Sequence, residues 1–237
     1  MLKEAIDRIL LLAEPHEVLD GDLHFTDKEL FPVQAPLSAP IAVHTLTGVV
    51  ELILAGVEDI DNGGCVVVVQ TYRAVSLCAK TSDVWGRRQT YVTAAPDEIA
   101  GFRFGTPLSA EEFAIALQAQ FVPGVGDVEY LARLASSITA EGATLAEDDG
   151  VSQKVTVRSG IALKDQVQVK RRVSLAPYRT FREVEQPASD FVFRVMTDAQ
   201  GVKCALFEAD GGAWRLAAMA SVKAWLAERI TDIEVVA

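Results

Sequence analysis

The chain of 237 residues contains only three cysteines, Cys65, Cys78 and Cys204. Their odd number, their wide spacing and their apolar neighbours, as in CVVVV and VSLCA, argue against a disulfide framework. We therefore expect buried thiols in a reducing compartment, and neither a disulfide nor a nucleophilic cysteine.

Long apolar runs are missing as well. Stretches such as residues 66–69 fall far short of the roughly 20 residues that cross a bilayer, so no membrane segment is predicted. The N-terminal stretch MLKEAIDRILLLAEP carries acidic residues within its apolar stripe and has no small-residue cleavage site. It indicates an amphipathic helix and not a signal peptide, and the expected location is the cytoplasm.

No complete catalytic, metal-binding or nucleotide-binding motif is present. The Gly211-Gly212 pair is not followed by the Lys-Ser/Thr of a P-loop and lacks the third glycine of a dinucleotide fingerprint. The serines lie outside any nucleophile elbow. The histidines His16, His24 and His44 predict no metal site, because no other type of metal ligand lies near any of them at a suitable spacing. The sequence therefore predicts no enzyme and no cofactor.

A two-metal nuclease site can be drawn from Asp148, Asp149 and Lys154, but the match is weak. Adjacent acidic residues point in different directions on a strand, and Asp-Asp-Gly before a strand is typical of a plain turn. We predict no metal site there.

Positive charge is scarce outside one block. Residues 1–150 carry 9 Lys and Arg against 23 Asp and Glu, a net charge of -14. Residues 151–200 carry 9 against 5, a net charge of +4, and the whole chain carries -11. Proteins that bind duplex nucleic acid usually present a basic face, so direct duplex binding is not expected. The basic block can pair with the acidic part, within one chain or between subunits, or can hold a small anionic ligand.

The order of predicted elements indicates an α+β fold with a mixed or antiparallel sheet and several packed amphipathic helices. The helices are expected at residues 2–13, 45–56, 109–121, 127–138 and 213–229, with a capping box at Ser109 and Glu112 and an N-cap at Asp127. The strands are expected at residues 16–26 as a hairpin, and at 65–79, 87–95, 154–158, 166–175, 191–196, 203–208 and 233–237. Residues 1–237 are predicted to form one domain, with residues 141–150 as a loop or a soft boundary.

Arg171 is an anomaly within the predicted strand 166–175. In a regular strand it shares a face with Val167, Val169, Val173 and Leu175. A guanidinium on an apolar face needs a carboxylate or an anionic ligand, because burying it without a partner costs several kcal/mol. The favoured alternative is a bulge at Arg171-Arg172, because it shifts the phase of the strand and turns Arg171 away from that face.

The segment ALFEADGGAWR predicts a strand, a tight Gly211-Gly212 turn and the start of the last helix. Free amides at a helix start can bind an anion. The favoured interpretation is that Asp210 caps the helix and satisfies these amides itself. Trp214 and Trp225 are then expected in the core, together with Val222 and Leu226.

The PYRTF segment lies between a strand and the acidic REVEQP loop. Pro177 fixes the backbone on entry and Pro187 fixes it on exit. The residues between them are expected to be rigid, with Phe181 packed inward and Arg179 paired.

Several motifs together resemble the YfdQ-like family of uncharacterised phage and prophage proteins. They are DDGVSQKVTVRSG, LAPYRTFREVEQPASDFVFR and ALFEADGGAW, with FAIALQAQF and VHTLTGVVELI earlier in the chain. The resemblance implies a bacteriophage origin, a place near replication or recombination genes, and the cytoplasm of a bacterial host. It supplies no catalytic residues.

Two hypotheses of function follow. The first is a non-catalytic accessory protein of phage DNA replication or recombination that forms homo-oligomers and contacts a phage or host protein. The second is a counter-defence protein that sequesters a small anionic nucleotide. Its ligand-binding residues would be Arg171, Arg179, Arg182, Gly211 and Gly212.

Overall fold

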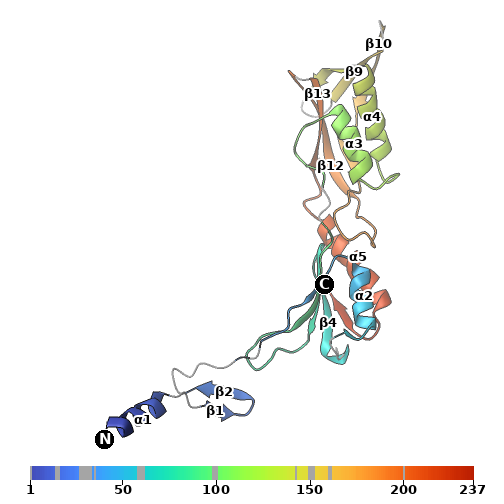
Figure 1. Ribbon diagram of the computed structural model, residues 1–237. Coiled ribbons are helices and arrows are strands. Elements are labelled where there is room, and N and C mark those ends of the chain that lie inside the picture. Colours follow the sequence, from blue (N-terminus) through green and yellow to red (C-terminus); the bar gives the residue numbers. More distant parts are fainter. Residues whose placement is uncertain are drawn as a thin grey trace.

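The computed structural model has the predicted α+β class and falls into three parts (Figure 1). It describes residues 2–13, 17–26, 34, 36–57, 62–97, 101–141, 143–148, 153–159, 162–199 and 201–237. We call the parts the N-terminal arm (residues 2–26), the five-stranded lobe and the four-stranded lobe. Among the described residues, no helix is long and apolar enough to cross a membrane.

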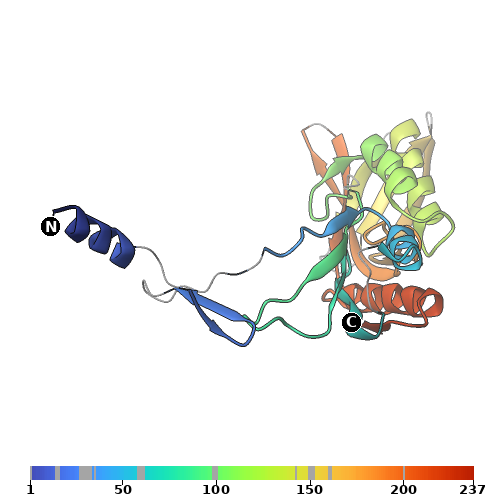
Figure 2. The ribbon, with the colours of Figure 1, turned by 60° about the horizontal axis from the view of Figure 1, so that its bottom comes forward.

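The N-terminal arm consists of one helix and one hairpin, as the sequence predicts. The helix is α1 (Leu2–Ala13), and the hairpin pairs β1 (Glu17–Asp20) with β2 (Leu23–Thr26). In two views the arm reaches away from both lobes (Figure 1, Figure 2).

The five-stranded lobe is built on a mixed sheet of order β14-β4-β5-β6-β3. Its predicted apolar run 65–79 folds back on itself at Tyr72-Arg73, and four successive residues of β5 are buried. α2 and α5 pack beside each other on this sheet (Figure 1). The bounds are β3 (Ile41–Val43), α2 (Leu46–Leu54), β4 (Cys65–Thr71), β5 (Ala74–Ala79), β6 (Thr90–Ala94), α5 (Trp214–Arg229) and β14 (Glu234–Val236).

The four-stranded lobe combines an antiparallel sheet of order β11-β12-β13-β7 with α3, α4 and a three-stranded sheet of order β10-β9-β8. The bounds are β7 (Leu108–Ser109), α3 (Ala110–Gln120), α4 (Val128–Glu141), β8 (Ala143–Asp148), β9 (Gln153–Ser159), β10 (Ala162–Val169), β11 (Arg172–Leu175), β12 (Ser189–Asp198) and β13 (Gly201–Glu208).

Two expectations about this lobe are wrong. Residues 141–150 were expected to be a loop or a soft boundary, but they contain β8, which pairs with β9. The strand predicted at residues 166–175 was expected to begin at residue 166, but β10 already begins at Ala162. In both cases strand pairing with β9 decides the structure of a polar segment, and strand propensity depends strongly on such context.

The buried apolar residues form two clusters, one in each lobe. Each cluster draws on residues from both sides of residues 141–150, so that stretch does not separate them. Phe181 and Val184 belong to the cluster of the five-stranded lobe, although Leu175 and Phe191, which flank them in sequence, belong to the other. The segment of residues 176–188 therefore enters the five-stranded lobe and returns.

The predicted capping box at the start of α3 is confirmed. The Glu112 amide donates to Ser109 Oγ at 3.2 Å, and the Ser109 amide donates to Glu112 Oε2 at 3.0 Å. The bonds that the Ser109 amide and hydroxyl donate to the Glu112 carboxylate lower the pKa of that carboxyl. We expect Ser109→Ala to lower the free energy of unfolding by about 1 kcal/mol in denaturant titrations. Ser136→Ala is the control, because the Ser136 hydroxyl donates only to the Ala132 carbonyl within α4. Equal losses in the two variants would contradict a role for the cap.

Candidate functional site

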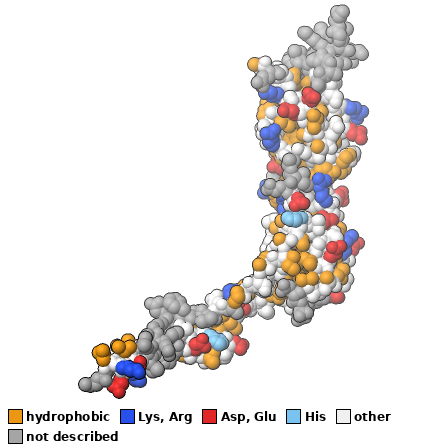
Figure 3. Space-filling view, in the orientation of Figure 1, with side chains coloured by type: hydrophobic (Ala, Val, Ile, Leu, Met, Phe, Trp, Pro, Cys, Tyr) orange, Lys and Arg blue, Asp and Glu red, His pale blue; other side chains and the backbone are white. Residues whose placement is uncertain are grey.

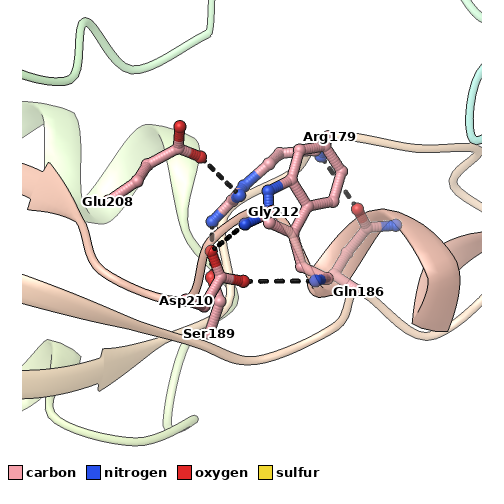
Figure 4. A network of polar contacts seen from close by, with 7 residues as sticks. Arg179, Gln186, Ser189, Glu208, Asp210 and Gly212 are labelled. Carbon is pink, nitrogen blue, oxygen red and sulfur yellow. Dashed lines mark hydrogen bonds and ion pairs between the residues drawn. The ribbon is translucent and has the colours of Figure 1, made fainter.

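The candidate site lies around Arg179, where residues of the two lobes meet. Figure 4 shows the polar contacts of Arg179. The Arg179 guanidinium donates to Glu208 Oε1 at 2.9 Å and to Ser189 Oγ at 2.7 Å. Its Cζ lies 4.2 Å from the ring centroid of Trp214, and its side chain is only 10% exposed. Burial lowers the pKa of Arg179 to about 10, against the opposing effect of Glu208 and Asp210. The group therefore stays charged at neutral pH.

The buried side chain of Gln186 holds the segment around Arg179 in place. Its Oε1 accepts from the amides of Arg179 and Thr180, at 2.9 and 3.2 Å. Its Nε2 donates to the carbonyls of Phe181 and Val184, at 2.9 and 3.2 Å. Phe181 is fully buried. The predictions that Phe181 packs inward and that Arg179 is paired are thus confirmed.

The same segment is bonded directly to the five-stranded lobe. Glu183 Oε1 accepts from the amides of Leu46 and Thr47, at 2.7 and 3.3 Å, at the start of α2. The Thr180 hydroxyl donates to the carbonyl of Tyr72, in the turn between β4 and β5. Negative charge at a helix N-terminus is favourable, so Glu183 stabilises α2 while it joins the lobes.

Asp210 caps the last helix, as favoured from the sequence. Its Oδ1 accepts from the Gly212 amide at 3.0 Å, and its Oδ2 accepts from the Trp214 amide at 3.2 Å (Figure 4). Gly211 and Gly212 have φ of +63° and +83°, a conformation that glycine adopts without steric cost. The amides of Gly212 and Trp214 are therefore already used within the chain. Trp214, Val222 and Leu226 are buried as predicted, whereas Trp225 is half-buried at the edge of its cluster.

Arg171 is exposed while Val169 and Val173 are buried, so it does not point into the core as it would in a regular strand. The strand is interrupted at Lys170-Arg171, between β10 of the three-stranded sheet and β11 of the four-stranded sheet, although the Arg171 carbonyl accepts from the Phe193 amide of β12 at 2.8 Å. A break in phase was one of the three alternatives, and the structure has it there. At the start of α4 the Asp127 carboxylate accepts from Lys170 Nζ and the Ser174 amide, so it ties α4 to β11.

Arg182 is exposed, and its Cζ lies 4.1 Å from the ring centroid of Tyr178. It faces a hollow of about 500 Å³ that is also lined by His44 and Glu183. Of the five ligand residues predicted from the sequence, Arg179 alone lines the cavity where the lobes meet, and Arg182 faces the neighbouring hollow.

The cavity beside Arg179 has a volume of about 220 Å³ and draws on both lobes. Its lining includes Tyr72, Arg73, Phe104, Glu208, Trp214 and Arg215. Sequence reasoning missed Tyr72, Arg73, Phe104 and Arg215 as site residues, because they come from three separate segments. The Tyr-Arg pair between two apolar strands was the one local signal, since a turn exposes such residues.

The cysteines do not contribute to this site. All three are free and buried, as predicted, and burial raises the pKa of the Cys204 thiol to about 12. Within the described ranges, no group of three or more His, Cys, Asp or Glu side chains is placed to hold a metal ion. Asp149, part of the disfavoured metal site, lies outside the described residues.

Comparison with protein-family models, with curated proteins and with solved structures finds no match for this chain. The family resemblance therefore rests on the sequence motifs alone.

Proposed function

We propose that this chain is a non-catalytic binding and assembly protein that associates with further copies of itself through the N-terminal arm. The observation that carries the proposal is the arm, which reaches away from both lobes and exposes apolar side chains (Figure 3). The family resemblance gives the context, an accessory role in phage DNA replication or recombination with a phage or host protein as a further partner.

The helix of the arm has an apolar face without a covering surface among the described residues. Leu2, Ile6 and Ile9 lie on one face of α1 and are 81%, 49% and 64% exposed. A single helix of 12 residues is marginal in water, because nucleation is costly and helices gain most of their stability from packing. The apolar face of α1 is therefore expected to be covered by another surface.

The hairpin of the arm also exposes apolar side chains that another surface would cover. Every residue of β1 is exposed, with Val18 at 50% and Leu19 at 64%. A two-stranded hairpin is marginally stable on its own, so it needs a third strand or a packed face. A partner that covers both the helix and the hairpin would supply this.

A second copy of the chain suits the arm better than a strongly charged partner does. The described part of α1 carries Lys3 and Arg8 against Glu4 and Asp7, so it has no net charge. The two lobes expose apolar side chains that can receive such a surface, among them Leu54, Ile115 and Leu216 at 76%, 60% and 73% exposure. Apolar burial is then the main driving force of association.

The test is the mass in solution of the full chain at micromolar concentration, by light scattering and sedimentation. We expect an oligomer, and we expect Ile6→Glu/Ile9→Glu to shift it to a monomer with unchanged circular dichroism of the lobes. Loss of two buried isoleucines from an interface weakens association by about 3 kcal/mol or more per copy. Lys3→Gln/Arg8→Gln is the matched control, because it changes the net charge by the same amount on the polar face. A wild-type chain that is monomeric and insensitive to salt would overturn the proposal.

A further inference from the structure

The cavity between the lobes has the chemistry of a site for a phosphorylated aromatic ligand. It brings together Arg73, Arg179 and Arg215 against two carboxylates, Asp97 and Glu208. Asp210 lies close enough to act on Arg179 as well, so three arginines face three carboxylates. Such a cluster of arginines is unusual in a chain whose net charge is -11. Ligand pockets also form preferentially where two lobes meet, because both can contribute groups to one concave surface.

The roles of these charges differ. Glu208 is paired with Arg179, and Asp97 lies 3.2 Å from His44 Nδ1. The guanidiniums of Arg73 and Arg215 have no carboxylate within ion-pair distance among the described residues. They are also more accessible than Arg179, since Arg73 is half-buried and Arg215 is exposed. Arg73 and Arg215 are therefore the cations available to an incoming phosphate. Arg179 also lines the cavity, but its guanidinium is held by Glu208 and Ser189.

The aromatic groups of the cavity are already arranged. The rings of Tyr72 and Trp214 meet edge to face, with centroids 4.7 Å apart. The Arg215 guanidinium lies 6.0 Å from the Tyr72 ring and 5.6 Å from the Trp214 ring. Trp214 is buried, with the Arg179 guanidinium 4.2 Å from its ring centroid, so it backs the cavity and Tyr72 is the more accessible ring. A planar ring that enters the cavity can stack on Tyr72 within reach of Arg215.

We propose that this cavity binds a nucleoside monophosphate, with the base against Tyr72 and the phosphate between Arg73 and Arg215. The proposal goes beyond self-assembly and does not depend on it. It also differs from the pocket expected from the sequence, because Arg171, Gly211 and Gly212 take no part. Arg179 contributes charge but is held by Glu208 and Ser189.

Isothermal titration calorimetry of the full chain tests the proposal with AMP, GMP, CMP and UMP as separate probes. We expect saturable binding of at least one of them, with one site per chain. Inorganic phosphate and the matching nucleoside should each bind about tenfold more weakly or worse, since each lacks half of the contacts. A probe of either kind that binds as tightly as the nucleotide would overturn the two-part site.

Substitutions of the two accessible arginines test whether the nucleotide binds in this cavity. Arg73→Ala and Arg215→Ala should each weaken nucleotide binding by about tenfold or more, because each removes one charged contact to the phosphate. Neither side chain is deeply buried, so both variants should keep the wild-type melting temperature. Arg133→Ala is the control, because Arg133 is an exposed arginine on α4 that does not line this cavity. No saturable heat with any of the four nucleotides at millimolar concentration would overturn the proposal, as would wild-type affinity in Arg215→Ala.

Discussion

Replacing Gly126 with alanine is expected to lower the free energy of unfolding by about 3–4 kcal/mol. Gly126 has φ of +62°, and an added Cβ would lie 2.0 Å from the carbonyl oxygen of Ser174. The left-handed conformation costs alanine about 1–2 kcal/mol. Relief of the clash separates the start of α4 from β11 and breaks the two hydrogen bonds between Asp127 and Ser174, at about 1 kcal/mol each.

Gly124→Ala provides the control within the same turn. Gly124 has φ of +72°, but nothing lies within 4 Å of an added Cβ. It should therefore show the conformational cost alone, about 1–2 kcal/mol. Thermal unfolding followed by circular dichroism should place Gly126→Ala about 5 °C or more below Gly124→Ala. Equal melting temperatures in the two variants would contradict this expectation. They would show that β11 can move away from the added Cβ at Ser174 without lowering the free energy of unfolding.

The sequence predicts the local features of this fold well, because neighbouring residues determine them. The Ser109 capping box needs only Glu112, three residues away, and the Asp210 cap needs only the amides that follow it. The same holds for the apolar stripe of α1, which the structure shows as a helix. Such signals act over one or two turns of chain, so they survive in any tertiary context.

Features that depend on pairing or packing with another segment were missed. Residues 143–148 form a strand because β9 pairs with them, although the segment is polar. The strand is interrupted at Lys170-Arg171, where β10 ends and β11 begins, and the alternation of residues alone could not fix that point. The division into two lobes could not be predicted either. It depends on the cluster of Phe181 with residues more than 80 positions away, such as those of β4 and β6.

The candidate site contains residues that the local sequence predicts and residues that only the fold brings together. Arg179 was predicted as a paired arginine because prolines flank its segment, and its partners Ser189 and Glu208 lie further along the same part of the chain. Tyr72, Arg73 and Arg215 reach the same cavity from a hairpin turn and from the first turn of α5. No spacing in the sequence links a turn at residue 72 to a helix at residue 214, so only the fold reveals this part of the site.

Arg179→Ala is expected to lower the free energy of unfolding by about 2–4 kcal/mol, or the melting temperature by several degrees. The substitution removes charged hydrogen bonds to Glu208 and Ser189 and the contact of the guanidinium with the Trp214 ring. It leaves Ser189, which is 7% exposed, without its donor. Charged hydrogen bonds contribute about 1.5–3 kcal/mol and a desolvated cation–π contact up to about 2 kcal/mol.

Two further variants separate the causes of this loss. Arg179→Lys keeps the charge but not the planar fork, so it should recover only part of the stability. Arg182→Ala removes an exposed arginine three residues along the same segment, whose guanidinium lies over the Tyr178 ring. It should change the free energy of unfolding by less than about 0.5 kcal/mol. If Arg179→Ala instead keeps the wild-type melting curve and loses nucleotide binding or self-association, Arg179 is a binding residue and the two lobes are held together by Thr180, Glu183 and Phe181 without it.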